Sequence, residues 1–232
     1  MINKDIFTRY LTGHIAKETA TPKTKNALPV VTISREAGCG AEHIAKKLVV
    51  KLNALYPNAK PKWRYINKEV MESAAEKLKL RVDEVERNYN QEGRALVEDL
   101  FFSFGKNYYN YNDVKVKKTI MKVVRDFAME GNIIIVGRAG ESLTQGFDRA
   151  LHTSLKAPLS WRKQNLIERW EIDEQEAEEY IERNDKRREH FRSFYSKGKE
   201  VQFDFTIDTS RFTEDEIVEI LHDTLKLKKY LK

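Results

Sequence analysis

A glycine-rich turn is the part of this sequence best suited to carry chemistry. The β-branched run of residues 30–33 predicts a buried strand, Ser34-Arg-Glu-Ala-Gly-Cys-Gly40 follows, and apolar residues then recur at helical spacing over residues 44–55. A strand, turn and helix in this order can build a phosphate site, because backbone N–H groups point inward and a helix N-terminus favours an anion. Gly38 and Gly40 would let the backbone approach a phosphate closely, although a tight turn without a ligand has the same spacing.

The turn departs from the usual phosphate-loop pattern, G-x-x-x-x-G-K-[ST]. Arg35 stands at the first glycine position, Ala41 at the lysine and Glu42 at the serine or threonine. The scaffold of a phosphoryl-transfer site is therefore present without its best-known cation. Arg35 or Lys46 could supply the missing positive charge.

Two further residues of this segment carry chemically reactive groups. Cys39 would lie at a helix N-terminus, where a thiolate is stabilised, but we interpret it as a small filler residue rather than a nucleophile. His43, one turn into the helix, could contact phosphate oxygens or serve as a structural histidine. Cys39 is the single cysteine of the chain, so no internal disulfide can form, and we expect a cytoplasmic protein.

An arginine directly follows the second aliphatic run of the sequence. Residues 133–136 are typical of a parallel strand covered on both faces, and Gly137-Arg138 comes next. In open α/β sheets ligands bind at the carboxyl ends of strands, where an arginine can hold a phosphate through a bidentate fork. We expect Arg138 to bind a ligand, with a structural ion pair as the alternative.

The charge of the chain changes from acidic to basic along residues 168–199. Arg183 and Arg187 are four residues apart, as are Arg188 and Arg192, so a helix would present two arginine pairs on adjoining faces. Such a helix could close over transferring phosphates and neutralise their charge, whereas charge runs more often form a solvated face.

The overall composition is that of a globular protein suited to a polyanionic ligand. The 232 residues are 41% hydrophobic and 34% charged, and the net charge of +6 suits a nucleotide, a nucleic acid or a phosphorylated metabolite. Apolar runs fall short of the ~20 residues that span a membrane, and the N-terminus lacks a signal-peptide core. We therefore expect no membrane partner.

Strands alternate with helices along the chain, which predicts an α/β fold with a parallel central sheet. Besides the two runs described above, we expect strands near residues 63–66, 150–155 and 203–208. Capping patterns predict that helices begin after Asp173 and Thr213.

Five segments, taken in order, resemble the cytidylate kinase-like family of P-loop nucleoside monophosphate kinases. They are Ser34-Arg-Glu-Ala-Gly-Cys-Gly40, Ile133-Ile-Ile-Val-Gly-Arg138, Ala157-Pro-Leu-Ser-Trp-Arg162, Ile181-Glu-Arg-Asn-Asp-Lys-Arg187 and Phe205-Thr-Ile-Asp-Thr-Ser-Arg211. The resemblance implies a three-layer P-loop NTPase-like core with a parallel five-stranded sheet. It divides the chain into an N-terminal helix and linker (1–29) and a kinase-like domain (30–232). Within that domain it implies a helical acceptor-binding insertion over 67–130 and an arginine-bearing lid over 170–200.

The reaction that the resemblance implies moves the γ-phosphate of ATP·Mg²⁺ onto a nucleoside monophosphate, CMP or dCMP by name. Arg138 and Asp185 would bind the acceptor, and the catalytic charge would come from Arg35, Arg183 and Arg187. The residues predicted to bind the donor phosphates are Ser34, Arg35, Glu36, Ala37, Gly38, Cys39, Gly40, Ala41 and His43. The metal ligands stay unassigned.

These observations support three functions. The first is a kinase of small phosphorylated acceptors. The second is a kinase-derived nucleotide-binding protein with weak or no turnover, which is favoured because the loop lysine is absent and because Val136 and Ala139 replace two acids of the kinases' Asp-Gly-Arg-Asp. The third is a basic nucleic-acid-binding protein that would use the arginine helix and Tyr108-Tyr-Asn-Tyr111 for stacking. A nucleotide or another small phosphorylated ligand is the favoured partner, and the oligomeric state is left open.

Overall fold

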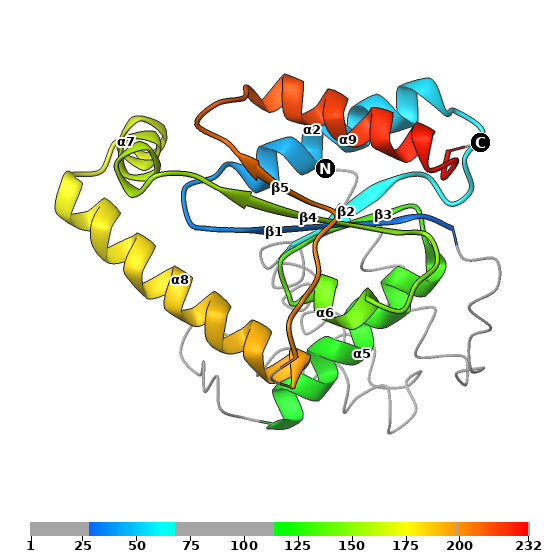
Figure 1. Ribbon diagram of the computed structural model, residues 1–232, viewed down its shortest axis with the longest axis horizontal. Helices are drawn as coiled ribbons and strands as arrows, with labels where there is room; N and C mark the ends of the chain where they lie inside the picture. The colour runs from blue at the N-terminus through cyan, green and yellow to red at the C-terminus, as the bar shows by residue number, and fades with distance from the viewer. Residues whose placement is uncertain (1–27, 68–113, 198, 232) are drawn as a thin grey trace, which may run out of the picture.

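In the computed structural model, residues 28–67, 114–197 and 199–231 are described, and they contain one sheet of five parallel strands (Figure 1). The strands are β1 (Val30–Arg35), β2 (Arg64–Ile66), β3 (Ile133–Val136), β4 (Ala150–Lys156) and β5 (Phe205–Asp208). Their order across the sheet is β2-β3-β1-β4-β5, and every neighbouring pair is parallel. The predicted α/β class and the five-stranded parallel sheet are confirmed.

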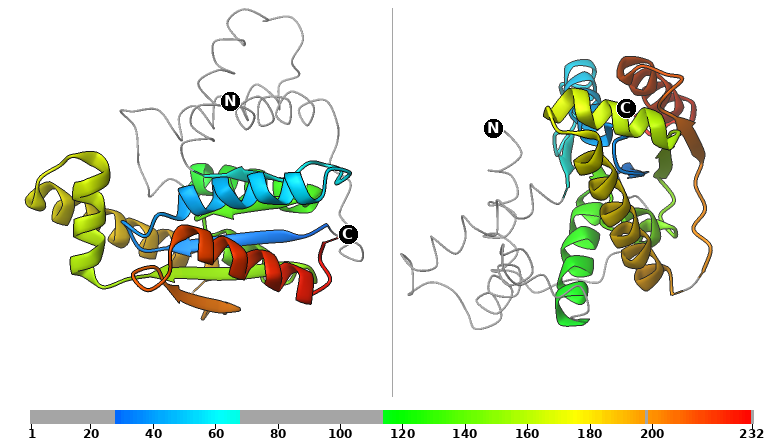
Figure 2. Two further views of the ribbon diagram at one scale, coloured as in Figure 1. Left: turned by 90° about the horizontal axis from the view of Figure 1, so that it is seen from above. Right: turned by 90° about the vertical axis from the view of Figure 1, so that its left-hand side faces the viewer.

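Helices cover both faces of the sheet, which makes three layers (Figures 1 and 2). The described helices are α2 (Ala41–Leu55), α5 (Val114–Glu130), α6 (Gly140–Thr144), α7 (Leu159–Trp170), α8 (Glu174–Ser196) and α9 (Glu214–Leu227). Helices α2 and α9 lie side by side on one face, and α5 and α6 lie on the other. Each helix in the described ranges is too short or too polar to cross a bilayer.

The aliphatic runs form central strands because both of their faces are buried. Ile134 and Val136 of β3 join the core beneath α2 and α9, to which α2 contributes Leu48. Ile135 points to the other face, where its side chain packs beneath the start of α6 at Gly140. A strand covered on both sides needs apolar residues at every position rather than alternation, and β3 has them.

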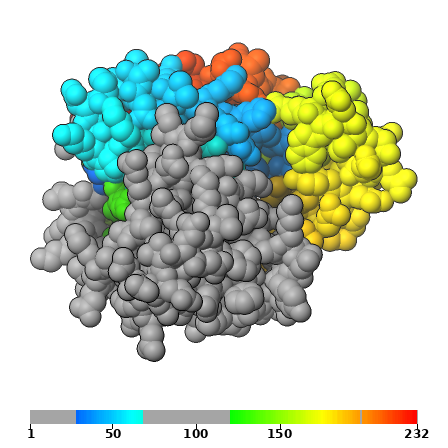
Figure 3. All heavy atoms as spheres, turned by 180° about the vertical axis from the view of Figure 1, so that it is seen from behind, coloured from blue at the N-terminus to red at the C-terminus, as the bar shows by residue number. Residues whose placement is uncertain are grey.

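The central strands β1 and β3 are neighbours whose chains continue on opposite faces of the sheet. Strand β1 leads into α2, whereas β3 leads into α6, so the carboxyl ends of these two strands form the topological switch point where open α/β sheets bind ligands. Helices α7 and α8 lie at this same edge (Figure 1). In the view from behind, α7 and the first part of α8 lie beside the start of α2 (Figure 3).

Both predicted capping boxes are present. Asp173 accepts a hydrogen bond from the backbone N–H of Glu176 at the start of α8, and Thr213 does the same for Glu216 at the start of α9. In each box the glutamate carboxylate in turn accepts a hydrogen bond from the backbone N–H of the cap residue. The long α8 therefore begins at a position that its own sequence specifies.

Part of the predicted domain organisation lies outside the described residues. This applies to the N-terminal helix and most of its linker and to residues 68–113 of the predicted acceptor-binding insertion. The described part of that insertion, α5, packs against β3 and α6. Its buried side chains include Val124 and Phe127, so α5 belongs to the layer that supports the sheet.

We expect Leu48→Ala to destabilise the protein by about 2–5 kcal/mol, because Leu48 is fully buried on α2 and its truncation leaves a cavity. Chemical denaturation measures this loss of unfolding free energy. Val50 on the same helix is 70% exposed, so Val50→Ala should change the unfolding free energy by less than about 0.5 kcal/mol. Equal effects of the two substitutions would contradict the burial of this face.

Candidate active site

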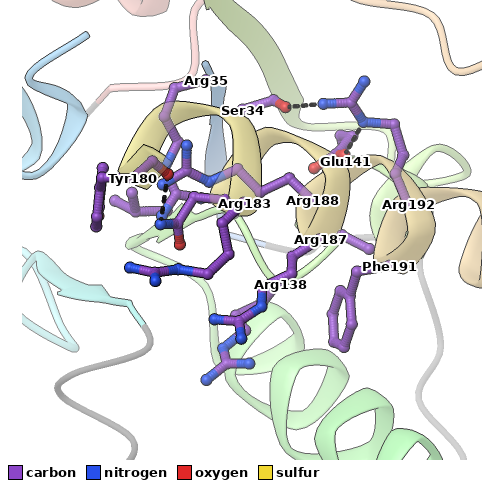
Figure 4. Close-up of a pocket in the computed structure, with 14 residues that line it drawn as sticks. Ser34, Arg35, Arg138, Glu141, Tyr180, Arg183, Arg187, Arg188, Phe191 and Arg192 are labelled. Carbon is purple, nitrogen blue, oxygen red and sulfur yellow. Dashed lines mark hydrogen bonds and ion pairs between the residues drawn. The ribbon is translucent and has the colours of Figure 1, made fainter. Parts of the chain in front are cut away.

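A cavity of about 330 Å³ lies at the carboxyl edge of β1 and β3, enclosed by α6 and α8 (Figure 4). We call it the arginine cavity, because among the described residues six arginines line it: Arg35, Arg138, Arg183, Arg187, Arg188 and Arg192. Ser34, Tyr180, Phe191 and the carboxylate of Glu141 also line it. This concentration of guanidinium groups suits a ligand with several negative charges.

The backbone that carries Arg138 adopts a left-handed turn. Gly137, Arg138 and Ala139 have φ angles of 69°, 56° and 51°, and the N–H of Gly140 closes the turn on the carbonyl of Gly137 at 2.9 Å. Residues with a Cβ rarely adopt this conformation, which costs on the order of 1–2 kcal/mol for each residue. Strain of this kind is typical of functional sites, where it aims a side chain.

Gly137 also makes room for Arg35. A Cβ atom on Gly137 would lie 1.8 Å from Nη1 and 2.9 Å from Cζ of Arg35, so the guanidinium rests directly on this glycine. Arg35 is the last residue of β1, and Gly137 directly follows β3. The N–H of Gly137 donates to the carbonyl of Ile33 at 3.0 Å, which extends the hydrogen bonding between the two strands. The fold therefore brings Arg35 and the Gly137-Arg138 turn together at one edge of the sheet.

Helix α8 brings the other four arginines. Arg183 and Arg187 lie one turn apart, as do Arg188 and Arg192, and all four line the arginine cavity. Figure 4 shows the guanidinium groups of Arg138 and Arg187 extending to the same side of α8. The two arginine pairs therefore face a cavity and do not form a wholly solvated face.

The last part of α8 is fastened to the sheet through Arg192. Its guanidinium donates to Oγ of Ser34 at 2.9 Å and pairs with Glu141 at 3.3 Å (Figure 4). Glu141 is 2% exposed, and among the described residues its Oε2 has no hydrogen-bond partner. Burial raises the pKa of Glu141, although Arg192 and Arg35 act in the opposite direction.

The glycine turn lines a second cavity of about 300 Å³, which we call the glycine-loop cavity. Gly38, Cys39, Gly40 and Ala41 contribute to its wall. It shares four lining residues with the arginine cavity, namely Arg35, Val136, Tyr180 and Arg188. The two cavities therefore adjoin, with Arg35 and Arg188 at their junction.

A carboxylate from α8 holds the glycine turn. Oδ1 of Asp185 accepts a hydrogen bond from the backbone N–H of Ala37 at 2.7 Å and another from Arg188 at 3.2 Å. The nearly buried Arg162 of α7 donates to Oδ2 of Asp185 at 2.7 Å and to the carbonyl of Ala37 at 3.2 Å. One N–H of the turn is thus already satisfied by an anion that belongs to the protein.

Gly38 is required by packing as well as by its positive φ of 88°. A Cβ atom there would lie 2.8 Å from the carbonyl oxygen of Arg162, so α7 rests against the bare backbone of the turn. Asn165 of α7 donates to the carbonyl of Gly38 at 2.5 Å. The tight-turn alternative therefore accounts for this glycine without a ligand, although Gly38, like Gly40, also lines the cavity.

The cysteine of the turn is buried and poorly suited to nucleophilic chemistry. Cys39 is 2% exposed, and burial raises the pKa of its thiol to about 11, while a hydrogen bond with Thr209 acts in the other direction. The interpretation of Cys39 as a filler residue agrees with both observations.

The predicted site residues fall into three groups. Ser34, Arg35, Arg138, Arg183 and Arg187 line the arginine cavity. Arg35, Glu36, Gly38, Cys39, Gly40, Ala41 and His43 line the glycine-loop cavity. Ala37 and Asp185 bond to each other between the turn and α8. The roles assigned to all these residues stay predictions.

Two charged residues near the predicted donor site bond to groups of the protein itself. The carboxylate of Glu36 accepts from the N–H of Ala157 at 3.3 Å and lies 3.5 Å from Nε of Arg162. Lys46, one of the cations that could replace the loop lysine, pairs with Glu42 at 2.7 Å along α2. Glu42 is thereby neutralised by a neighbour on its own helix.

Several residues of the site were not predicted to belong to it. Arg188 and Arg192 were recognised as a helical pair, and this spacing was the signal that could have placed them with Arg183 and Arg187. Glu141 and Arg169 gave no such signal, because they reach the site through contacts with other elements, and Arg162 stood only in one of the segments that resemble the family. Arg169 lines the glycine-loop cavity.

Comparison with known proteins supports the architecture. The model of the cytidylate kinase-like family matches residues 30–211. The crystal structure of an uncharacterized protein from Eubacterium ventriosum is similar with a TM-score of 0.55 and 20% identity, covering 85% of this chain and 98% of that chain. That of TT1252 from Thermus thermophilus gives a TM-score of 0.40 and 16% identity over 87% and 99% of the chains. None of the curated proteins matches. At these identities the first structural likeness shows the fold alone.

We expect the Cys39 thiol to resist modification in the folded protein. With its pKa at about 11 instead of 9.0, the thiolate fraction at pH 8 falls about 100-fold, and burial slows the reaction further. The rate of reaction with Ellman's reagent, native against guanidinium-unfolded, measures this directly, because the chain has a single cysteine. Similar rates in the two states would mean that the thiol is reactive.

We expect Glu141→Gln to gain stability relative to the natural protein as the pH rises. The folded-state pKa of Glu141 lies above its ordinary value of 4.5, so between these values the folded state binds more protons than the unfolded state. Stability contributed by protonated Glu141 is therefore lost as the pH rises, by at most about 1.4 kcal/mol per pH unit. Denaturation of both proteins from pH 4.5 to pH 8 gives the difference, and a constant difference would contradict this environment.

Proposed function

The chain belongs to the cytidylate kinase-like family, and we propose that it transfers a phosphoryl group from a nucleoside triphosphate to a small phosphorylated acceptor. The observation that carries the proposal is the pair of adjoining cavities at the switch point of the sheet, which share Arg35 and Arg188. Phosphoryl transfer depends on positioning and on charge stabilisation, so two anion-binding cavities with cations at their junction have the arrangement it needs.

We assign the donor to the glycine-loop cavity and the acceptor to the arginine cavity. The turn and the start of α2 would hold the phosphate chain of the donor through backbone N–H groups. Arg138, fixed by its left-handed turn, would hold the phosphate of the acceptor. The transferred group would lie between them, beside Arg35 and Arg188, with Arg183 and Arg187 closing the acceptor side. A CMP- or dCMP-like acceptor is proposed from the resemblance.

Magnesium carried by the triphosphate fits the residues present. Mg²⁺ in such sites takes one or two protein carboxylates and completes its shell with phosphate oxygens and water. The described residues contain no cluster of three or more His, Cys, Asp or Glu that could bind a metal without a nucleotide. Glu141 lines the arginine cavity, the proposed acceptor side, and its Oε2 is unpartnered among the described residues, so we assign it as a carboxylate that would hold Mg²⁺ from that side. The ion would neutralise charge on the transferring phosphates.

A specific observation favours a second candidate function, nucleotide binding with weak or no turnover. Asp185 occupies the N–H of Ala37, and the lysine position of the turn holds Ala41. A protein with these features would bind a nucleotide while lacking part of the charge stabilisation for transfer. The nucleic-acid hypothesis is less favoured, because the arginines of α8 line a cavity; its tyrosine cluster lies outside the described residues.

We expect the purified protein to phosphorylate at least one of CMP, dCMP, UMP, AMP and GMP with ATP and Mg²⁺, measured by product formation. Arg138→Ala should weaken binding of that acceptor by about 10- to 100-fold, as the loss of a charge-assisted contact predicts. Arg149→Ala removes an arginine that directly precedes β4, at the amino edge of the sheet, where it bonds to the carbonyl of Tyr230, and serves as the matched control.

The same assay separates the two candidate functions. The kinase function is supported if the natural protein and Arg149→Ala form product and Arg138→Ala does not. Absence of product with every acceptor, together with a melting temperature raised by ATP, supports nucleotide binding without turnover. Absence of both product and stabilisation contradicts both.

A further inference from the structure

The glycine turn has a cation beside it that does not come from its own helix. The lysine position of the turn holds Ala41, and the next residue, Glu42, is acidic and paired with Lys46. Arg169, at the end of α7, instead places its guanidinium against Gly40. A Cβ atom on Gly40 would lie 3.7 Å from each of the two terminal nitrogens of Arg169.

Three hydrogen bonds fix the guanidinium in this place. Nε donates to Oδ1 of Asn165 at 2.9 Å, Nη2 to Glu214 at 2.6 Å and Nη1 to Nδ1 of His43 at 2.8 Å. Asn165 also bonds to the carbonyl of Gly38, so the residue that orients Arg169 is itself held by the turn. The position of the charge is therefore coupled to the conformation of the glycine turn.

Arg169 keeps the capacity to bind an anion. A guanidinium has five N–H groups, and within the described residues three of them are used in these contacts, which leaves two. The side chain is 32% exposed and lines the glycine-loop cavity together with Gly38 and Gly40. Because arginine can only donate, Nδ1 of His43 is the acceptor in this hydrogen bond.

Arg169 shares its acidic partner, Glu214, with a second cation. Glu214 lies 2.6 Å from Arg169 and also 3.4 Å from Nζ of Lys47, so a single carboxylate is shared by two cations. Lys47 in turn reaches Asp215 at 2.9 Å, on the side of α9. Glu214 therefore orients Arg169 toward the turn. The second carboxylate of this network, Asp215, pairs with Lys47.

We propose that Arg169 binds the phosphate chain of the donor at the glycine turn, in place of the lysine that the turn lacks. This inference rests on the proposed function, because it assigns a residue to the donor site of that reaction. Arg169 differs from a loop lysine in approaching from α7, across the mouth of the turn. A planar fork in this position can contact two phosphate oxygens at once.

Calorimetric titration tests the proposal with ATP, AMP and inorganic tripolyphosphate as probes. We expect Arg169→Ala to weaken ATP and tripolyphosphate binding by about 10- to 100-fold and AMP binding by less than about threefold, because AMP lacks the outer phosphates. Arg169→Lys should recover part of the loss, since it restores a charge without the fork. Arg149→Ala again serves as the control for loss of an arginine away from the site.

The outcomes distinguish this proposal from the function on which it rests. If the natural protein binds ATP and Arg169→Ala binds it equally well, the role of Arg169 is wrong while the kinase proposal stands. Equal weakening of all three probes by Arg169→Ala would also overturn the proposal, because it would indicate a general structural role. If the natural protein does not bind ATP, the proposed donor is wrong. In that case, tripolyphosphate binding by the natural protein and by Arg169→Ala still tests the role of Arg169. If the natural protein binds neither ATP nor tripolyphosphate, both proposals are overturned.

Discussion

The contact between Asp185 and the glycine turn is the constraint on which the geometry of the site depends. It joins three elements, because Asp185 belongs to α8, Ala37 to the turn after β1, and Arg162, which bonds to both, to α7. A nearly buried guanidinium such as Arg162 is stable only when its charge is paired. The pairing fixes α8 over the carboxyl edge of the sheet, and the arginines of α8 reach the cavity because of it.

The site concentrates positive charge, and nearby groups of the protein must stabilise it. Within the described part of the chain, six arginines line one cavity, and the carboxylate of Glu141 lies among them at an energetic cost shown by its raised pKa. The aromatic ring of Phe191 lies 5.9 Å from Cζ of Arg138, a contact that stabilises a cation without neutralising it. Mutual repulsion between the guanidinium groups is relieved when an anion binds, so the cavity is suited to attract one.

The sequence predicted the sheet and the arginine helix well, because their signals are local. The aliphatic residues 133–136 specify a strand buried on both faces, and Asp173 with Glu176 specifies where α8 begins. For the cavity, the sequence indicated some of the lining arginines but not the contacts that hold them in place. Asp185 and Ala37 are 148 residues apart, and the contact of Arg169 with His43 spans 126, so neither leaves a pattern in the chain.

The left-handed turn was beyond sequence reasoning for a different reason. Gly137 permits a positive φ, but Arg138 and Ala139 disfavour one, and only packing around them accounts for their conformation. The turn ends against the sheet at Gly140, where a Cβ atom would lie 2.6 Å from Cγ2 of Ile135. Local preference and tertiary structure disagree at these residues, which is where a functional site is expected.

The same turn determines whether the backbone of Arg138 loses its conformational entropy on folding or on ligand binding. A flexible loop would lose its backbone freedom at the moment a ligand arrives, and affinity would fall by that amount. Here the backbone of residues 137–139 is already confined to one conformation by the fold. Much of this cost therefore falls on folding rather than on binding, because the turn that presents Arg138 is already closed by its own hydrogen bond.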